Sequence, residues 1–404
     1  MDVVIIGGGW AGLGVSYELS RRRVAHRVFE RGRIAETWRT QRWDTFRLNT
    51  TMADTVMPGE SYQGPDPDGA MTHLEFISLL EDYARRHGLP VEEGRAVTRL
   101  AAENGGGFAV QLGDETVRAT TVVVATGSLC RPLPHPAWAM RLSLPQVDAC
   151  DYRSGAALPA GPVLVVGSGQ TGAQIAHDLK GAGRTVYLAT GRVGRIVRRY
   201  RGKDMLRWLD DSGFLDVRRA ELIAAAPNGR LPGRGVIGAT RTLSLQFLSA
   251  EGVILTGRLT GFADGRLTFA DDLDDHLRFG DEASENLKRF VDAYIERADI
   301  AAIAAEVDPA EAIAPRLSDP PILALDPGEL GCIVWCVGFR GDYGYVKVDG
   351  ALDAEGTPVH KDCVGAVPGL YFAGLDFGLT RRSGTIRAVC EESALIAELI
   401  AGRR

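Results

Sequence analysis

The sequence predicts an α/β protein with two Rossmann-like dinucleotide-binding domains, the smaller one inserted into the larger. Apolar, β-branched runs at 3–6 and 163–166 are each followed at once by a G-x-G-x-x-G pattern and a segment with helical spacing. Each helical segment leads into a further predicted strand, at 26–30 and 184–188. A strand, a glycine turn, a helix and a second strand make one nucleotide-binding unit, so the chain carries two such units.

The two units divide the chain, because 404 residues exceed what one ordinary core holds. We expect a first domain over 1–150, an inserted domain over 151–325, and the second part of the first domain over 326–404. The other predicted elements are a hairpin at 97–117, strands at 121–124, 333–336 and 370–373, helices at 72–87 (with Thr72 as N-cap), 286–297 and 386–400, and a linker at 301–318.

Composition and charge narrow the functional class. The net charge is −6, so no strongly basic surface is expected and nucleic acid is not a predicted partner. The apolar N-terminus has Asp2 where a signal peptide carries positive charge, and no run of about 20 apolar residues could span a membrane. The six cysteines show no C-x-x-C spacing, which predicts reduced thiols and no metal site. We therefore expect a cytoplasmic protein that contacts no membrane.

The first glycine pattern, GGGWAG at 7–12, predicts a dinucleotide site for FAD. Its first glycine makes the tight turn, the second admits the pyrophosphate to the backbone, and the third lets helix and strand pack closely. Glu30 ends the following strand, where a carboxylate hydrogen-bonds the ribose of the adenosine. The residues predicted to bind this cofactor are Gly7, Gly9, Trp10, Ala11, Gly12, Glu30 and Arg31.

The second pattern, GSGQTG at 167–172, differs at the end of its next strand and predicts NADPH. That strand leads to Thr190 instead of an acid, and Arg192 follows. Losing the carboxylate removes repulsion against a 2′-phosphate, and a guanidinium supplies a bidentate partner for it. Further arginines stand at Arg195, Arg198 and Arg199. The residues predicted to bind NADPH are Gly167, Gly169, Gln170, Thr171, Gly172 and Arg192.

Several motifs resemble those of the flavin-containing monooxygenases, the class B flavoprotein monooxygenases, with the bacterial single-chain branch most similar. They are GGGWAGLG at 7–14, TWRTQRWDTFRLNT at 37–50, VVVATG at 122–127, GSGQTGAQIA at 167–176, VWCVGF at 334–339 and LYFAGLDFGLTRRSGTI at 370–386. The chain departs from the family in three places: no His stands near 148, Ala35-Glu36 replaces a Gly-Gly pair, and WCVGF at 335–339 replaces W-A-T-G-F.

The resemblance implies a function and further site residues. It implies that NADPH reduces FAD, that O₂ forms a C4a-(hydro)peroxyflavin, and that one oxygen atom passes to a small-molecule substrate. The missing His favours N- or S-oxygenation over Baeyer–Villiger insertion. Asn49 is the candidate catalytic hydrogen-bond donor, with a cap at a strand end as its alternative role. The motifs add four residues to the flavin site: Trp38, Thr126, Gly127 and Asp376.

Other functions stay open at this point. An NADPH-dependent flavin reductase or oxidase, which passes electrons to a protein or small acceptor without oxygenation, shares the cofactor motifs. A disulfide reductase needs a redox C-x-x-C that this chain lacks, and a scaffold without activity would not need intact glycines at both patterns. Arg39, Arg42 and Arg382 could orient an anionic substrate or contact phosphate. The sequence leaves the substrate and a homodimer open.

Overall fold

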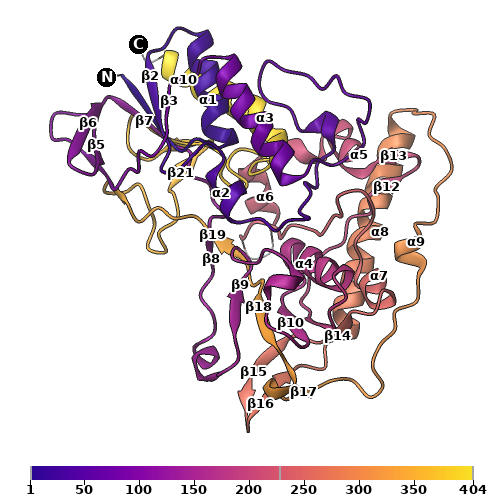
Figure 1. Cartoon of the computed structure of the whole chain (residues 1–404). Coiled ribbons are helices and arrows are strands. Elements are labelled where there is room, and N and C mark those ends of the chain that lie inside the picture. Colours follow the sequence, from indigo (N-terminus) through magenta and orange to yellow (C-terminus); the bar gives the residue numbers. More distant parts are fainter. Residues whose placement is uncertain (1, 227–228, 403–404) are drawn as a thin grey trace.

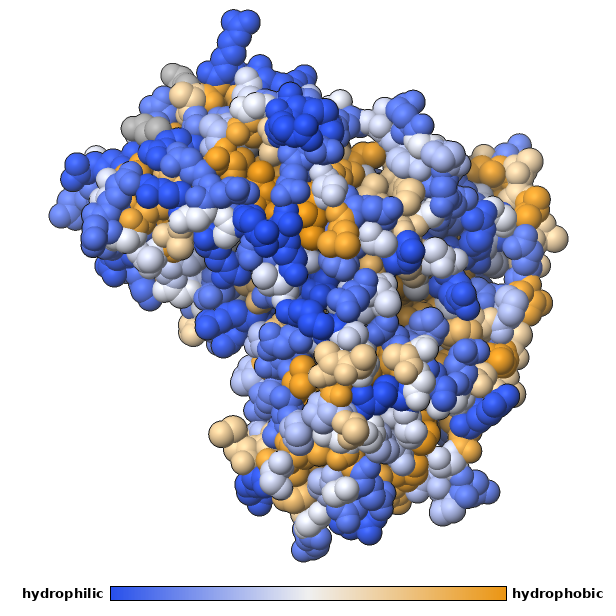
Figure 2. Space-filling model, viewed as in Figure 1, coloured by the Kyte–Doolittle hydropathy of each residue, from blue (hydrophilic) through white to orange (hydrophobic). Residues whose placement is uncertain are grey.

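The computed structural model describes residues 2–226 and 229–402, and these residues form two lobes, each built on a parallel sheet (Figure 1). Both chain termini lie on the lobe that carries α1 (Trp10–Arg21), α3 (His73–Arg86) and α10 (Val389–Ala401). The other lobe carries α4 (Gln170–Gly181) and α8 (Leu273–Arg297). Hydrophilic residues cover most of the surface on this face, and hydrophobic ones form scattered groups (Figure 2).

The first sheet has seven strands in the order β21-β22-β23-β7-β1-β2-β3. β1 lies at its centre with all four residues buried, and it pairs in parallel with β2 and β7. Helix α1 packs against α10 on one face, which brings the two ends of the chain together. The strands are β1 (Val3–Ile6), β2 (His26–Phe29), β3 (Val91–Glu92), β7 (Thr121–Val124), β21 (His360–Lys361), β22 (Val364–Gly365) and β23 (Leu370–Phe372).

The second sheet has five strands in the order β14-β11-β10-β18-β9, all parallel. They are β9 (Gln146–Asp148), β10 (Val163–Val166), β11 (Val186–Ala189), β14 (Ile254–Thr256) and β18 (Cys332–Trp335). The predicted α/β class with two Rossmann-like units is therefore confirmed. However, β18 and β9 form one side of the second sheet, next to β10, although they lie outside the boundaries predicted at 151 and 325, because the connections between the lobes themselves pair as strands.

The remaining elements support these sheets. The helices are α2 (Glu36–Thr40), α5 (Met205–Asp211), α6 (Arg219–Ala225), α7 (Leu245–Ala250) and α9 (Pro309–Ala312), and the 3-10 turns lie at 52–54, 137–141, 155–157, 214–216, 327–329 and 386–388. The small sheets contain β4 (Arg99–Ala102), β5 (Phe108–Leu112), β6 (Glu115–Ala119), β8 (Arg131–Pro132), β12 (Arg199–Tyr200), β13 (Lys203–Asp204), β15 (Leu259–Ala263), β16 (Arg266–Phe269), β17 (Ala324–Leu325), β19 (Phe339–Arg340) and β20 (Val346–Lys347).

Two predicted segments differ from the structure. Helix α8 begins 13 residues before its predicted start at 286. The prediction missed its first half because that half is charged and packs through the small residues Gly280 and Ser284, which leave no apolar stripe in the sequence. The stretch 301–318, expected to be a linker, is tied to the inserted lobe. Asp308 caps α9 and accepts a hydrogen bond from Thr242 at 2.5 Å.

Helix α3, in contrast, begins as predicted. Thr72 accepts from the Glu75 amide at 3.2 Å, and the Glu75 carboxylate accepts from the Thr72 amide at 2.7 Å, a complete capping box. Among the residues that the structure describes, no helix is long and apolar enough to cross a membrane.

Candidate functional site

The first glycine turn opens a cavity at the carboxyl ends of β1, β2 and β7. Gly7 has φ +113, and a Cβ there would lie 2.5 Å from the Ala125 carbonyl oxygen. A Cβ on Gly12 would overlap the Gly7 carbonyl oxygen, whereas a Cβ on Gly9 would meet no atom within 4 Å. Gly7 and Gly12 are therefore required by packing, and Gly9 faces open space at the start of α1, where an anion would meet free backbone N–H groups.

The cavity next to Gly9 encloses about 1200 Å³, including the part open to solvent. Nine of the eleven residues predicted for the flavin site line it: Gly7, Gly9, Trp10, Ala11, Glu30, Arg31, Trp38, Thr126 and Gly127. Gly12 lies behind the turn, and Asp376 lines a neighbouring cavity of about 1060 Å³ that shares Asp342 and Gly344 with the first. The first lobe thus gathers nine of the eleven residues around one cavity.

The Glu30 carboxylate is fixed at the end of β2. It is buried, and its two oxygens accept hydrogen bonds from the amides of Gly8 at 2.6 Å and Gly32 at 2.9 Å. These two amides hold the carboxylate in the wall of the cavity, in the place where a Rossmann acid meets an adenosine ribose.

The structure adds residues to this cavity that the motifs missed. The Tyr345 hydroxyl lies 3.3 Å from the Thr126 hydroxyl, and burial raises the pKa of Tyr345. No sequence signal marks Tyr345, because it lies more than 200 residues from its partner. Gly374 also lines the cavity, with φ +72 and no room for a Cβ beside Ala11. The AGLD motif at 373–376 contains this glycine, so the sequence did offer a signal for it.

The Asp376 carboxylate is engaged within the chain. It accepts from the Arg234 guanidinium at 2.5 Å, and the Asp376 amide donates to Ser128 at 3.2 Å. The neighbouring cavity that Asp376 lines also contains Arg219 and Arg340. Asp376 therefore lies at the border of the two cavities with its charge already paired.

The second glycine turn repeats the geometry of the first. Gly167 has φ +102, and a Cβ there would lie 2.5 Å from the Cys336 carbonyl oxygen. A Cβ on Gly172 would overlap the Gly167 carbonyl oxygen, while a Cβ on Gly169 meets nothing within 4 Å. Thr171 follows in the first turn of α4 and is partly exposed. An anion could approach this helix start as it could approach the first.

The Gln170 side chain, predicted to touch the nucleotide, is held by the chain. Its amide nitrogen donates to the Ile237 carbonyl at 2.9 Å, and its oxygen accepts from the Ile237 amide at 3.0 Å. Gln170 therefore ties the first residue of α4 to the loop at 234–239, and only its backbone is free for a ligand.

The four arginines after β11 are not equivalent. Arg192 is exposed, and its guanidinium lies 4.7 Å from the centre of the Phe279 ring, with no carboxylate partner in the described part of the chain. The others each form an ion pair: Arg195 with Asp281 and Glu311, Arg198 with Asp204, and Arg199 with Asp68. Arg192 is thus the one of the four whose charge is available to a phosphate.

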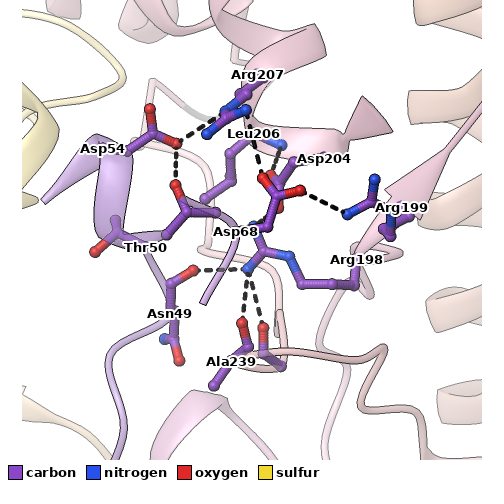
Figure 3. Close-up of polar contacts among 12 residues, drawn as sticks. Asn49, Thr50, Asp54, Asp68, Arg198, Arg199, Asp204, Leu206, Arg207 and Ala239 are labelled. Atoms are coloured by element: carbon purple, nitrogen blue, oxygen red, sulfur yellow. Dashed lines mark hydrogen bonds and ion pairs between the residues drawn. The ribbon is translucent and has the colours of Figure 1, made fainter. Parts of the chain in front are cut away.

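Asn49 lies where the two lobes meet (Figure 3). Its side-chain oxygen accepts from the Gln174 amide of α4 at 3.1 Å, and its carbonyl accepts from Arg198 at 2.7 Å. The side chain is partly exposed and points away from Arg198, so Asn49 is placed between the first lobe and the helix of the second glycine turn.

The arginines expected to orient an anion also differ among themselves. Arg39 pairs with Glu81, and Arg382 pairs with Asp216 and, at 3.3 Å, with Asp210. Arg42 instead stacks on Trp38 and Phe46, with its guanidinium 4.6 Å and 5.4 Å from the ring centres. Burial lowers the pKa of Arg42 to about 10.

Fold and sites together define a protein with two nucleotide-binding units of the kind that pass electrons between a flavin and a pyridine nucleotide. The family described as Pyridine nucleotide-disulphide oxidoreductase matches residues 4–209, about half of the chain, and the chain belongs to this family. The predicted cofactors, FAD and NADP(H), and an oxidoreductase class are confirmed at this level.

Individual relatives add detail. An uncharacterized CzcO-like oxidoreductase of Geobacillus kaustophilus is 27% identical, and the match covers 96% of this chain and 95% of that protein. Indole-3-pyruvate monooxygenase YUCCA4 of Oryza sativa subsp. japonica is 34% identical over 44% of each chain. The solved flavin-containing monooxygenase of Stenotrophomonas maltophilia has a TM-score of 0.66 at 17% identity, covering 100% of this chain and 98% of that one. The fold expected from the motifs is therefore confirmed.

Proposed function

We propose that this chain is an NADPH-dependent FAD monooxygenase that transfers one atom of O₂ to a small-molecule substrate, with N- or S-oxygenation favoured over Baeyer–Villiger insertion. The observation that supports it most strongly is that two glycine turns of equal geometry occur together with a cavity in which Cys130 is the one thiol among the described lining residues. Relatives named as monooxygenases by sequence and by structure support the same assignment.

The residues present fit both cofactors. Gly9 and the start of α1 would receive the FAD pyrophosphate, the Glu30 carboxylate the adenosine ribose, and Trp38 with Thr126 would line the rest of the cavity. Gly169 would admit the NADPH pyrophosphate, and Arg192 would bind the 2′-phosphate. When bound, FAD accepts hydride from NADPH and, once reduced, reacts with O₂ for oxygen transfer.

Asn49 is the side chain proposed to act at the reacting atoms. Its oxygen is occupied by Gln174, which leaves the Nδ2–H groups without a partner among the described residues. These N–H groups would donate to the nicotinamide or to the oxygen being transferred. The rest of the protein's task is to keep water away from the reacting atoms, which prevents loss of reducing power as hydrogen peroxide.

The family description also names disulphide oxidoreductases, and the thiols of this chain argue against that activity. All six cysteines are free in the structure. A dithiol relay needs two cysteines beside the flavin, but only Cys130 lines the cavity formed by the described residues, and burial raises its pKa. A reductase or oxidase without oxygenation is the alternative that the experiment separates.

The test is the fate of the oxygen atoms. We would supply the FAD-loaded protein with NADPH, ¹⁸O₂ and a panel of thioethers, tertiary amines and cyclic ketones, and analyse products by mass spectrometry. The proposal predicts one ¹⁸O atom in a sulfoxide or N-oxide, with NADPH consumed in equal amount. Hydrogen peroxide as the sole oxygen product with every substrate would contradict it and support the reductase or oxidase.

A further inference from the structure

Arg198 is a buried arginine whose two terminal guanidinium nitrogens both donate to groups inside the protein. Its guanidinium pairs with Asp204, and both side chains are only 4% exposed. One terminal nitrogen also donates to three carbonyl oxygens, those of Asn49 at 2.7 Å, Gly238 at 3.1 Å and Ala239 at 3.4 Å (Figure 3). Arg198 is one of the further arginines after the second glycine turn, and these bonds occupy both of its terminal nitrogens, so the pair of donors that would bind a 2′-phosphate is already engaged.

The position of these carbonyls shows what the arginine holds together. Asn49 follows Trp38 and Phe46 in the first lobe, whereas Gly238 and Ala239 belong to a loop of the inserted lobe. A buried ion pair contributes little net stability compared with apolar residues of the same volume. The distinctive effect of a guanidinium here is to fix the directions of carbonyl groups from two segments that are far apart in sequence.

Asp204 keeps the guanidinium itself in place. One of its oxygens pairs with Arg198, and the other accepts from the Leu206 amide at 2.8 Å as the N-cap of α5. The arginine is therefore anchored to the start of a helix, and a shift of Asn49 relative to the inserted lobe would break hydrogen bonds that no water reaches easily.

A second set of contacts links Asn49 to helix α4. Gln174 donates to the Asn49 side-chain oxygen, and Gln170 is bonded twice to Ile237, the residue before Gly238. Residues 170 and 174 are four apart, so they lie on one face of the helix, one turn from each other. Helix α4 begins at the open space beside Gly169. The second nucleotide site thus connects to Asn49 both directly, through Gln174, and through the 237–239 loop and Arg198.

We propose that Gln174 and Arg198 are positioning residues that hold Asn49 with its Nδ2–H groups directed away from α4, and that they transmit occupancy of the second nucleotide site to Asn49. Gln174 donates to the oxygen of Asn49, and this bond places that oxygen on the side of α4. Arg198 sets the place of its backbone. The inference rests on the proposed role of Asn49 as a donor in the oxygenation reaction.

Gln174→Glu is the sharpest variant, because a carboxylate has nearly the shape of the amide but can only accept. It would attract the Nδ2–H groups of Asn49 and so reverse the amide. Gln174→Leu removes the contact without reversing it. Arg199→Gln is the matched control, since Arg199 is exposed, adjacent in sequence and paired only with Asp68 among carboxylates.

The orientation is measured by NMR on FAD-loaded protein labelled with ¹⁵N-asparagine. The chain has only four asparagines, and Asn49→Asp identifies the Asn49 signal by its loss. We expect the Asn49 NH₂ signal to shift on addition of NADP⁺ in the wild type and in Arg199→Gln. In Gln174→Glu the signal should stand at a different position from the wild type even without NADP⁺. In Gln174→Leu the shift caused by NADP⁺ should be smaller than in the wild type. An Asn49 signal that is the same in all variants, with and without NADP⁺, would overturn the proposal.

Turnover supplies an independent test. Misplacement of a group by about 1 Å can cost about 100-fold in rate, so we expect both Gln174 variants to lose about tenfold or more in oxygenated product per NADPH, with hydrogen peroxide rising in its place. KM for NADPH should change less than about threefold, and Arg199→Gln should behave as wild type. If both Gln174 variants kept wild-type coupling, the positioning role would be refuted.

Arg198 needs a gentler change, because removing it would leave Asp204 buried and unpaired. Arg198→Lys keeps the charge beside Asp204 but cannot reach three carbonyls with a fork of donors. We expect it to bind FAD and to lose coupling as the Gln174 variants do, whereas wild-type coupling would restrict Arg198 to a structural role. If the wild type itself oxygenates nothing, the NMR result still decides whether nucleotide occupancy reaches Asn49, so the two failures can be told apart.

Discussion

Gly169 and Gly172 stand three residues apart in the same turn, yet the structure predicts opposite consequences for the same substitution. At Gly169 the backbone has φ −66 and ψ −174, which alanine adopts freely, and a Cβ would meet no atom within 4 Å. At Gly172 the Cβ would overlap the Gly167 carbonyl oxygen, which is backbone and cannot move aside cheaply. Gly169→Ala should therefore fold as well as the wild type, and Gly172→Ala should not.

The cost of Gly169→Ala should appear only with the nucleotide. If the open space receives the pyrophosphate, a methyl group there pushes the phosphates from the backbone N–H groups of α4. Charge-assisted hydrogen bonds contribute about 1.5–3 kcal/mol each, so losing one should weaken NADPH binding by about 10- to 100-fold. The melting temperature and FAD content should stay near wild type.

The assay is an anaerobic titration of FAD-loaded Gly169→Ala with NADP⁺ and NADPH, followed by flavin absorbance, beside thermal unfolding of both variants. Gly9→Ala is the matched variant in the first turn and should lower FAD content while leaving the inserted lobe folded. A Gly169→Ala protein that binds NADPH as tightly as the wild type would refute the reasoning, as would a Gly172→Ala protein of wild-type stability.

Three further predictions concern single side chains. Arg192→Gln should lower the preference for NADPH over NADH by about tenfold or more, because one charged partner of the 2′-phosphate is lost, and kinetics with both nucleotides measure it. Asn49→Ala should leave FAD content unchanged and raise hydrogen peroxide formation per NADPH, as a coupled peroxide assay would show. Burial raises the pKa of Glu392 from 4.5 to about 7, so the folded state binds its proton more tightly than the unfolded state. This stabilisation is complete below pH 4.5 and is lost as pH rises through 7, by about 3 kcal/mol; urea unfolding at pH 5 and pH 8 should show a smaller difference for Glu392→Gln.

The parts of the fold that could be predicted are those encoded locally. Each strand, glycine turn and helix of the two units lies within about 30 residues, and each glycine is required by atoms of its own turn or of the neighbouring strand. The acid at Glu30 and its absence at Thr190 follow from the same register. Such local patterns carry their meaning without knowledge of the tertiary structure.

The parts that could not be predicted depend on distant partners. The four arginines after β11 look alike in sequence, but Arg195 meets Glu311 and Arg199 meets Asp68, each more than 100 residues away. Which arginine stays free for a phosphate is decided by those partners. Tyr345 enters the flavin cavity for the same reason, and β9 and β18 join the second sheet because crossing segments pair with it.

The central claim is that one chain binds a flavin and reduces it with a 2′-phosphorylated nicotinamide nucleotide. The most direct test is to purify the protein, record its visible spectrum and add NADPH or NADH without oxygen. We predict a flavin spectrum that one equivalent of NADPH bleaches at least about tenfold faster than NADH does. A protein that remains colourless after incubation with FAD, or a bound flavin that neither nucleotide reduces, would contradict the account.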